Sequence, residues 1–158
     1  MDNKHASIRK DNFVRKICAS ERNIMQFQLA TDYAIRILHY LYENEGTLTT
    51  AVDMSEKLGV TYLYFMKVIG KLKKAGMVES VQGCNGGYRL GTNGGDISFY
   101  DIVMVMEDGI AINRCLQPDQ FCSRDAAPGC PVHQYYGELQ DVIIAMLKKK
   151  TIAGIAPK

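Results

Sequence analysis

The stretch that decides the fold is residues 61–90, TYLYFMKVIGKLKKAGMVESVQGCNGGYRL. In its first half, apolar residues recur at three- and four-residue intervals: Phe65, Val68, Ile69 and Leu72. This spacing predicts a helix with one apolar face, which ends at Gly76. In its second half, residues 77–81 alternate like a strand, residues 83–87 form a glycine-rich turn, and residues 88–90 alternate again. The stretch therefore predicts a helix followed directly by a two-stranded β-hairpin.

A shorter helix is expected just before this stretch, over residues 50–58, with Thr49 or Thr50 as its N-cap. Gly59 can take the left-handed conformation at its end, and Thr61 is the expected N-cap of the next helix. Two helices joined by a tight turn, the second basic on its outer face, form a helix-turn-helix pattern, and the hairpin that follows is its wing. We therefore expect a mainly α fold, a winged helix-turn-helix with a two-stranded β wing.

The flanking sequence predicts further helices over residues 26–43, 98–106 and 132–149. The last of these carries an apolar stripe larger than so small a domain needs locally, formed by Leu139, Val142, Ile143 and Met146. An unpaired stripe of this kind favours a partner helix, so we expect a homodimer with a long C-terminal dimerisation helix.

The chain is expected to divide into three parts. Residues 1–24 form an N-terminal extension, and residues 25–95 form the winged helix-turn-helix DNA-binding domain. Residues 96–158 hold the dimerisation helices together with a cysteine-rich loop at residues 114–133.

Composition and charge narrow the functional class. With 158 residues, 47% of them hydrophobic, the chain can bury a core. It has neither an apolar run long enough for a membrane span nor an apolar signal-peptide segment, so we expect a cytoplasmic protein with no membrane partner. Residues 61–90 hold five basic side chains against one acidic side chain, a local net charge of +4. This concentration favours binding to a phosphate backbone, although a solvated helix face is the plainer alternative.

Three cysteines and a histidine lie close together near the C-terminus, at Cys115, Cys122, Cys130 and His133. Their spacing is C-x6-C-x7-C-x2-H, on a segment rich in proline and glycine that can fold around one centre. Three thiolates and an imidazole suit zinc or an iron–sulfur cluster. The chain shows no nucleophile–base constellation, phosphate-binding loop or paired carboxylates, so an enzyme is not expected.

Taken together, these motifs resemble the IscR/NsrR regulators, the Rrf-two family. Residues 25–28 (MQFQ) and 32–36 (DYAIR) look like the opening helix of that family, and residues 64–78 (YFMKVIGKLKKAGMV) look like its recognition helix. Residues 86–90 (GGYRL) look like its wing, and three cysteines before a long helix complete the similarity. The resemblance implies a dimeric transcription factor whose DNA affinity depends on an iron–sulfur cluster, either [2Fe-2S] or [4Fe-4S].

By this resemblance the cluster ligands are Cys115, Cys122 and Cys130. The fourth ligand is His133, as in the iron–sulfur biogenesis regulators, or the partner subunit's Asp32, as in the nitric-oxide-sensing branch. His133 is favoured because the C-x2-H spacing is local and needs no second chain.

The expected DNA-binding residues lie on the recognition helix and the wing: Thr61, Tyr62, Met66, Lys67, Lys71, Gln82, Asn85 and Arg89. Thr61 would meet a phosphate, Lys67 and Lys71 the major groove and backbone, and Tyr62 and Met66 thymine methyl groups. Asn85 and Arg89 would reach the adjacent backbone or minor groove, while Gln82 stands where family members carry an arginine. A dimer would bind double-stranded DNA at an imperfect palindromic operator.

The expected function is that of a transcriptional regulator, acting as a repressor, whose cluster senses redox, nitric oxide or iron status. Operator position would decide between repression and activation. Two alternatives remain: a constitutive DNA-binding protein with a structural zinc site, and a metal-free thiol redox sensor involving Cys84 or Cys18.

Overall fold

The computed structural model describes residues 26–91, 93–107, 109–125 and 129–155, so the expected N-terminal extension of residues 1–24 lies outside the described residues. The α-helices are α2 (Leu29–Glu43), α3 (Ala51–Leu58), α4 (Tyr62–Lys74), α5 (Phe99–Glu107) and α6 (Pro131–Lys149). Strands β1 (Val78–Val81) and β2 (Gly87–Leu90) follow α4, and short 3-10 turns lie at η1 (Gly94–Asp96), η2 (Arg114–Leu116) and η4 (Ala153–Ile155). The mainly α winged helix-turn-helix is confirmed, with element ends that differ from expectation by at most three residues.

Local capping explains where the helix-turn-helix begins and ends. The Thr50 hydroxyl accepts a hydrogen bond from the Asp53 backbone N–H (3.2 Å) at the start of α3, and Gly59 closes that helix with a left-handed φ of 65°. Thr61 occupies the N-cap position of α4, but its side chain makes no capping hydrogen bond to any described residue. At the other end Gly76 takes a φ of 72°, which allows the Met77 N–H to donate to the Leu72 carbonyl (3.0 Å).

The wing is an antiparallel hairpin whose register pairs Val78 with Leu90 and Val81 with Gly87. Thr49, just before α3, adds a short third edge through two backbone hydrogen bonds with Tyr88 (2.9 and 3.2 Å). This bridge ties the base of the wing to the start of the helix-turn-helix. A backbone contact on the β2 side of the wing therefore helps to set the direction in which the wing leaves the body.

One hydrophobic core holds these elements together. Phe65 lies within it, fully buried, and meets the ring of Tyr88 edge-on at 6.1 Å between centroids. The core also takes in Ile102 and Met106 from α5 and Ile152 from the C-terminal segment. The two parts that the sequence divides at residue 95 therefore share a core.

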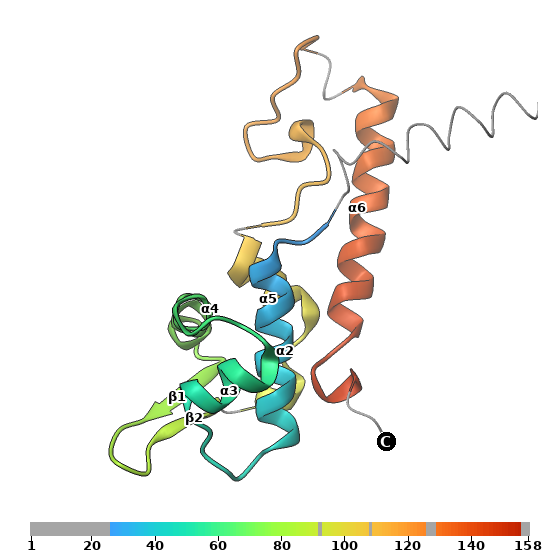
Figure 1. The fold of residues 1–158 in the computed structure, drawn as a ribbon. Coiled ribbons are helices and arrows are strands. Elements are labelled where there is room, and N and C mark those ends of the chain that lie inside the picture. Colours follow the sequence, from blue (N-terminus) through green and yellow to red (C-terminus); the bar gives the residue numbers. More distant parts are fainter. Residues whose placement is uncertain (1–25, 92, 108, 126–128, 156–158) are drawn as a thin grey trace, which may run out of the picture.

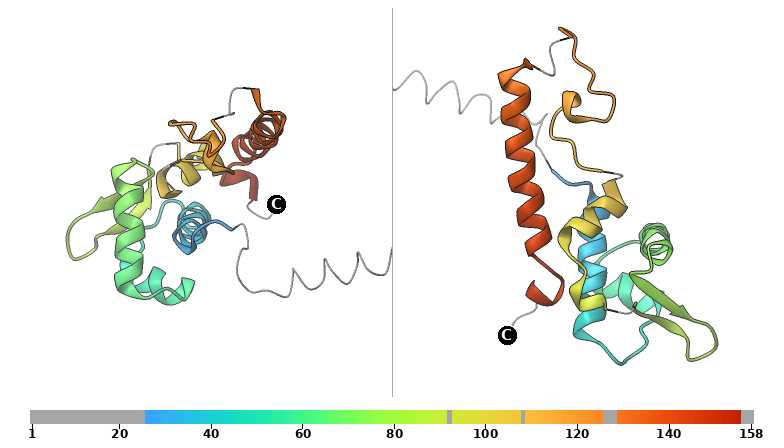
Figure 2. Two further views of the ribbon diagram at one scale, coloured as in Figure 1. Left: turned by 90° about the horizontal axis from the view of Figure 1, so that it is seen from above. Right: turned by 180° about the vertical axis from the view of Figure 1, so that it is seen from behind.

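The C-terminal segment returns to the body after α6. The Phe99 N–H donates to the Lys150 carbonyl (2.8 Å), and the Ile152 N–H donates to the Ile97 carbonyl (3.0 Å). In Figures 1 and 2, α6 runs beside α5 on the side of the molecule away from the wing. Within the described residues, no helix combines the length and apolar character that crossing a membrane requires.

Candidate nucleic-acid interface and cysteine pocket

The outer face of α4 is exposed, apolar and flanked by positive charge. Tyr62 is 49% exposed, Leu63 83% and Met66 37%. Lys67 is exposed beside them, as are Lys73 and Lys74 further along the helix. The opposite face is buried in the core, so α4 can meet a second molecule only through this strip. Of these residues, Tyr62, Met66 and Lys67 were expected at the DNA from the sequence. Leu63 was not, although its three-residue spacing from Met66 places it on the same face.

Two residues expected at the DNA have partners inside the protein. The Lys71 ammonium donates to the Met106 carbonyl at the end of α5 (3.1 Å), and its side chain is half-buried. The Arg89 guanidinium contacts the Glu79 carboxylate of the paired strand at 2.8 and 2.9 Å. Gln82 and Asn85 are exposed toward the tip of the wing. The structure thus exposes the wing tip and the first half of α4. Lys71 is engaged in the fold, whereas Arg89 is ion-paired with Glu79 but keeps an exposed side chain.

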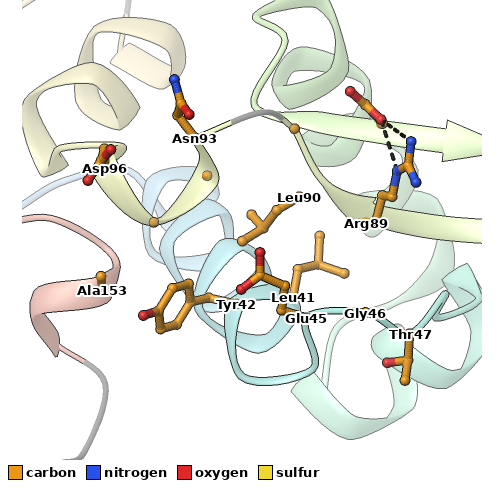
Figure 3. Close-up of a pocket in the computed structure, with 14 residues that line it drawn as sticks. Leu41, Tyr42, Glu45, Gly46, Thr47, Arg89, Leu90, Asn93, Asp96 and Ala153 are labelled. Atoms are coloured by element: carbon orange, nitrogen blue, oxygen red, sulfur yellow. Dashed lines mark hydrogen bonds and ion pairs between the residues drawn. The ribbon is translucent and has the colours of Figure 1, made fainter.

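A cavity of about 680 Å³ lies at the base of the wing, between the end of α2, the η1 turn and Ala153 (Figure 3). Tyr42, Glu45 and Asp96 line it, and the dashed lines in Figure 3 mark the contact of Arg89 with Glu79 at its edge. The cavity contains none of the cysteines. It therefore lies apart from the cysteine loop.

A second cavity, of about 390 Å³, brings the four expected ligands together. Its lining includes Cys115 from η2, Cys122 from the loop, Cys130 at the N-cap of α6, and His133 from the first turn of α6. All four side chains are half-buried. Residues that are 18 positions apart in sequence thus line one pocket between the loop and the start of α6.

The ligand set matches a metal centre in chemistry, and one of its atoms is conspicuous. His133 Nδ1 is buried, and no described residue gives it a hydrogen-bond partner. A buried nitrogen without a partner is costly unless something binds it. Among the described residues, however, no three His, Cys, Asp or Glu side chains are placed to hold a metal ion. The donors therefore fit such a group in kind, but the loop would have to close around it.

The loop is organised by an ion pair between Arg114 and Asp119. The hydrogen bonds from Arg114 lower the pKa of the Asp119 carboxyl, and the same bonds raise the pKa of Arg114. The guanidinium also lies over the Phe121 ring, 5.4 Å from its centroid. Asn113 accepts a hydrogen bond from the Cys115 N–H (3.4 Å). These contacts are all near the surface and bury little, so the loop is held by local polar contacts instead of a core.

Comparison with known proteins gives this geometry a family. The family model Rrf2, described as "Iron-dependent Transcriptional regulator", matches residues 27–158. The chain belongs to the Rrf2 family. It is a transcriptional regulator and not an enzyme, as its sequence indicates. The match includes the recognition helix, the wing and the cysteine loop, so each feature described above lies within the family domain.

One curated relative and several solved structures are similar to this Rrf2 chain. Protein aau3 of Rhizobium meliloti is 31% identical over 132 residues, which cover 79% of this chain and 86% of the relative. The global cysteine regulator CymR (YrzC) of B. subtilis is 22% identical with a TM-score of 0.69, covering 84% of this chain and 97% of that one. The T. potens IscR structure is 23% identical with a TM-score of 0.65, covering 83% and 85%. The oxidized form of Staphylococcus aureus CymR is 21% identical with a TM-score of 0.65, covering 85% and 98%. At these identities the solved structures establish the fold.

A short set of hydrogen bonds connects the recognition helix of this Rrf2 protein with the segment that leads to the cysteines. Lys71 of α4 holds the end of α5, as described above. Glu107, the residue after Met106, accepts hydrogen bonds from the Thr31 hydroxyl and from the Gln28 N–H (2.7 Å) at the start of α2. Beyond it, the Ile112 N–H donates to the Gln140 side chain of α6 (3.2 Å). The end of α5 is thus hydrogen-bonded to α4 and to the start of α2, and the segment that follows it is hydrogen-bonded to α6.

Proposed function

We propose that this chain is a homodimeric repressor that binds an imperfect palindromic operator and whose affinity is set by an iron–sulfur cluster. The observation that carries the proposal is the cysteine pocket: Cys115, Cys122, Cys130 and His133 line one cavity, and the buried Nδ1 of His133 has no hydrogen-bond partner among the described residues. Its family description as an iron-dependent regulator supports the same conclusion.

The three cysteines and His133 are the residues that would hold the cluster. Asp32, the other candidate for the fourth ligand, is already ion-paired with Arg36 on its own helix at 2.8 Å. The His133 nitrogen has no such partner among the described residues, which favours His133. A bound cluster would supply a redox-active centre that nitric oxide, peroxide or iron scarcity can destroy. The pocket is held by surface contacts, so its conformation can respond to such a loss.

The proposed DNA contacts come from the exposed part of the winged helix. Thr61 at the start of α4 meets a phosphate, and Lys67 lies toward the major groove and backbone. Tyr62 and Met66 contact base edges, while Gln82 and Asn85 reach DNA from the wing. Lys71 and Arg89 are assigned a supporting role, because their charges are engaged by Met106 and Glu79.

The proposed dimer forms along α6. Large apolar side chains recur on it at alternating intervals of three and four residues, and all are exposed: Val132, Tyr135, Leu139, Val142 and Met146. This is the spacing of a helix–helix seam. Pairing two copies of α6 would cover the stripe and place two recognition helices for the two halves of a palindrome.

Direct thiol sensing is the second candidate function. It is favoured by the similarity to CymR structures, one of which is an oxidized form. The thiols of Cys115 and Cys130 line the same pocket here. In this case the pocket would respond by thiol oxidation without any metal.

The deciding experiment is anaerobic purification of the full chain with iron, sulfide and zinc analysis and a visible spectrum. A brown protein with iron and sulfide supports the cluster. A colourless protein with stoichiometric zinc indicates a structural zinc site, and a colourless metal-free protein indicates the thiol sensor. Cys122→Ala should abolish the chromophore, whereas Cys84→Ala on the exposed wing should retain it. Equal loss in both variants would contradict the ligand assignment.

The DNA contact is tested by Lys67→Ala. We expect weaker operator binding and a salt dependence whose slope falls by about one, because one phosphate contact is lost. An unchanged affinity and slope would remove α4 from the interface.

A further inference from the structure

Gly70 occupies an unexplained position in the recognition helix. It lies inside α4, where glycine destabilises a helix relative to alanine. A Cβ built at this position would meet no atom within 4 Å, so packing within the described structure does not require glycine. Its φ is not left-handed either. Neither the fold nor the backbone accounts for a residue that costs the helix stability.

The face of α4 on which Gly70 lies gives a reason for a glycine at this position. Gly70 follows Leu63, Met66 and Lys67 by seven, four and three residues, so the four share one face of α4. That is the exposed strip described above, in which Leu63 is 83% exposed. A glycine there leaves the helix backbone open to close approach by a second molecule.

The side chains of the strip indicate which chemical groups the second molecule offers to α4. Exposed lysines flank it, which favours a polyanion, yet Leu63 and Met66 can offer only apolar contact to a base edge. The major groove of DNA carries one apolar group, the 5-methyl of thymine. The strip is therefore complementary to a thymine-containing major groove.

We propose that Leu63 and Met66 read thymine 5-methyl groups and that Gly70 admits the DNA to close contact with α4. This inference rests on the proposed function, since it requires α4 to enter the major groove. It extends the thymine contact already expected of Met66 to Leu63, and it makes Leu63 and Gly70 determinants of specificity.

The first test is Gly70→Ala in the full chain. We expect a higher melting temperature, because alanine favours the helix, together with at least about tenfold weaker operator binding from the added methyl group. Gly137→Ala in α6 is the matched control, since a Cβ there also meets nothing within 4 Å. It should raise the melting temperature while leaving affinity unchanged, with both variants retaining the wild-type sedimentation. Operator binding by Gly70→Ala as tight as wild type overturns the close approach.

The second test removes methyl groups from the DNA. The full chain selects an operator from random duplexes, and each thymine of that operator is then replaced singly by deoxyuridine. We expect about fourfold weaker binding at each contacted thymine, the effect of one buried methyl group. Leu63→Ala should bind the thymine and deoxyuridine forms equally at its position, because the contact is already absent.

The outcomes separate this inference from the proposed function. If no deoxyuridine substitution weakens wild-type binding, thymine reading is refuted, while a loss of affinity in Lys67→Ala keeps α4 at the DNA. If the selection enriches no sequence and Lys67→Ala has no effect, DNA reading by α4 itself fails, and this inference fails with it.

Discussion

Helices α4 and α6 both carry apolar stripes at helical spacing, but the molecule treats them differently. The stripe of α4 is buried in the core through Phe65, Val68, Ile69 and Leu72. The structure describes all 19 residues of α6, and none of these residues is fully buried. Large apolar side chains therefore remain at the surface of α6, with Met146 69% exposed.

The difference separates a tightly packed part of the molecule, around α4, from a loosely packed part, the cysteine loop and α6. Helix α4 is fixed by packing on α2 and α5 and by the wing, so its outer face is presented in one orientation. The cysteine loop is held by contacts near the surface, and α6 exposes its apolar stripe. Burial dominates the free energy of a fold, so the cysteine loop can change its conformation without unfolding the winged helix.

The largest effect on stability is expected from a change in the core of the winged helix. Phe65→Ala should lower the free energy of unfolding by about 3–5 kcal/mol, because it removes a fully buried ring and leaves a cavity. Chemical denaturation measures it, with Leu63→Ala on the exposed face as the control. A loss no larger than that of the control would mean that Phe65 does not anchor α4 in the core.

The next largest effect is expected in α6, on the free energy of dimerisation and not on that of folding. The double change Val142→Asp and Met146→Asp should weaken dimerisation by about 3 kcal/mol or more, because charges would enter an apolar seam. Sedimentation measures it, with Glu138→Gln on the same helix as control. A double variant that sediments like wild type would place the dimer interface elsewhere.

A smaller effect tests the connection between the two regions. Lys71→Met should lower the free energy of unfolding by about 1.5 kcal/mol, since a charge-assisted hydrogen bond to the Met106 carbonyl is lost while the apolar stem is kept. Thermal denaturation and operator titration across salt concentrations measure it. An unchanged stability with a shallower salt slope would instead make Lys71 a phosphate ligand.

The smallest effect concerns the entrance to the helix-turn-helix. Thr50→Ala should cost about 1 kcal/mol, because the Asp53 N–H loses its capping oxygen. Thr61→Ala is the matched comparison, since that side chain caps no described group. It should leave stability nearly unchanged but weaken operator binding, and an equal loss of stability in both variants would contradict this assignment.

Much of the site followed from spacing. The period of Phe65, Val68, Ile69 and Leu72 placed the recognition helix and predicted its outer face, because a helix has only one way to bury such a stripe. The spacing of the cysteines and His133 predicted that they would gather, and the structure lines one pocket with them. Whether they bind a cluster stays a prediction.

Other features depend on contacts between distant segments, which no local pattern specifies. Lys71 looked like a surface lysine of the helix, yet it reaches the end of α5, 35 residues further along the chain. Arg89 is likewise engaged by Glu79 through the register of the wing. A charged side chain can be assigned to DNA only after the fold shows whether it already forms a hydrogen bond or an ion pair within the protein.

The sequence by itself determined the helix-turn-helix, the wing and the positions of the expected ligands, because periodicity, caps and glycines act over a few residues. Only the tertiary structure decided that Ile152 returns to the core, that α6 leaves its stripe uncovered, and that Gly70 has open space above it. These depend on which surfaces remain after the chain has packed. Which surfaces stay uncovered is a property of the whole fold, and the local sequence pattern does not specify it.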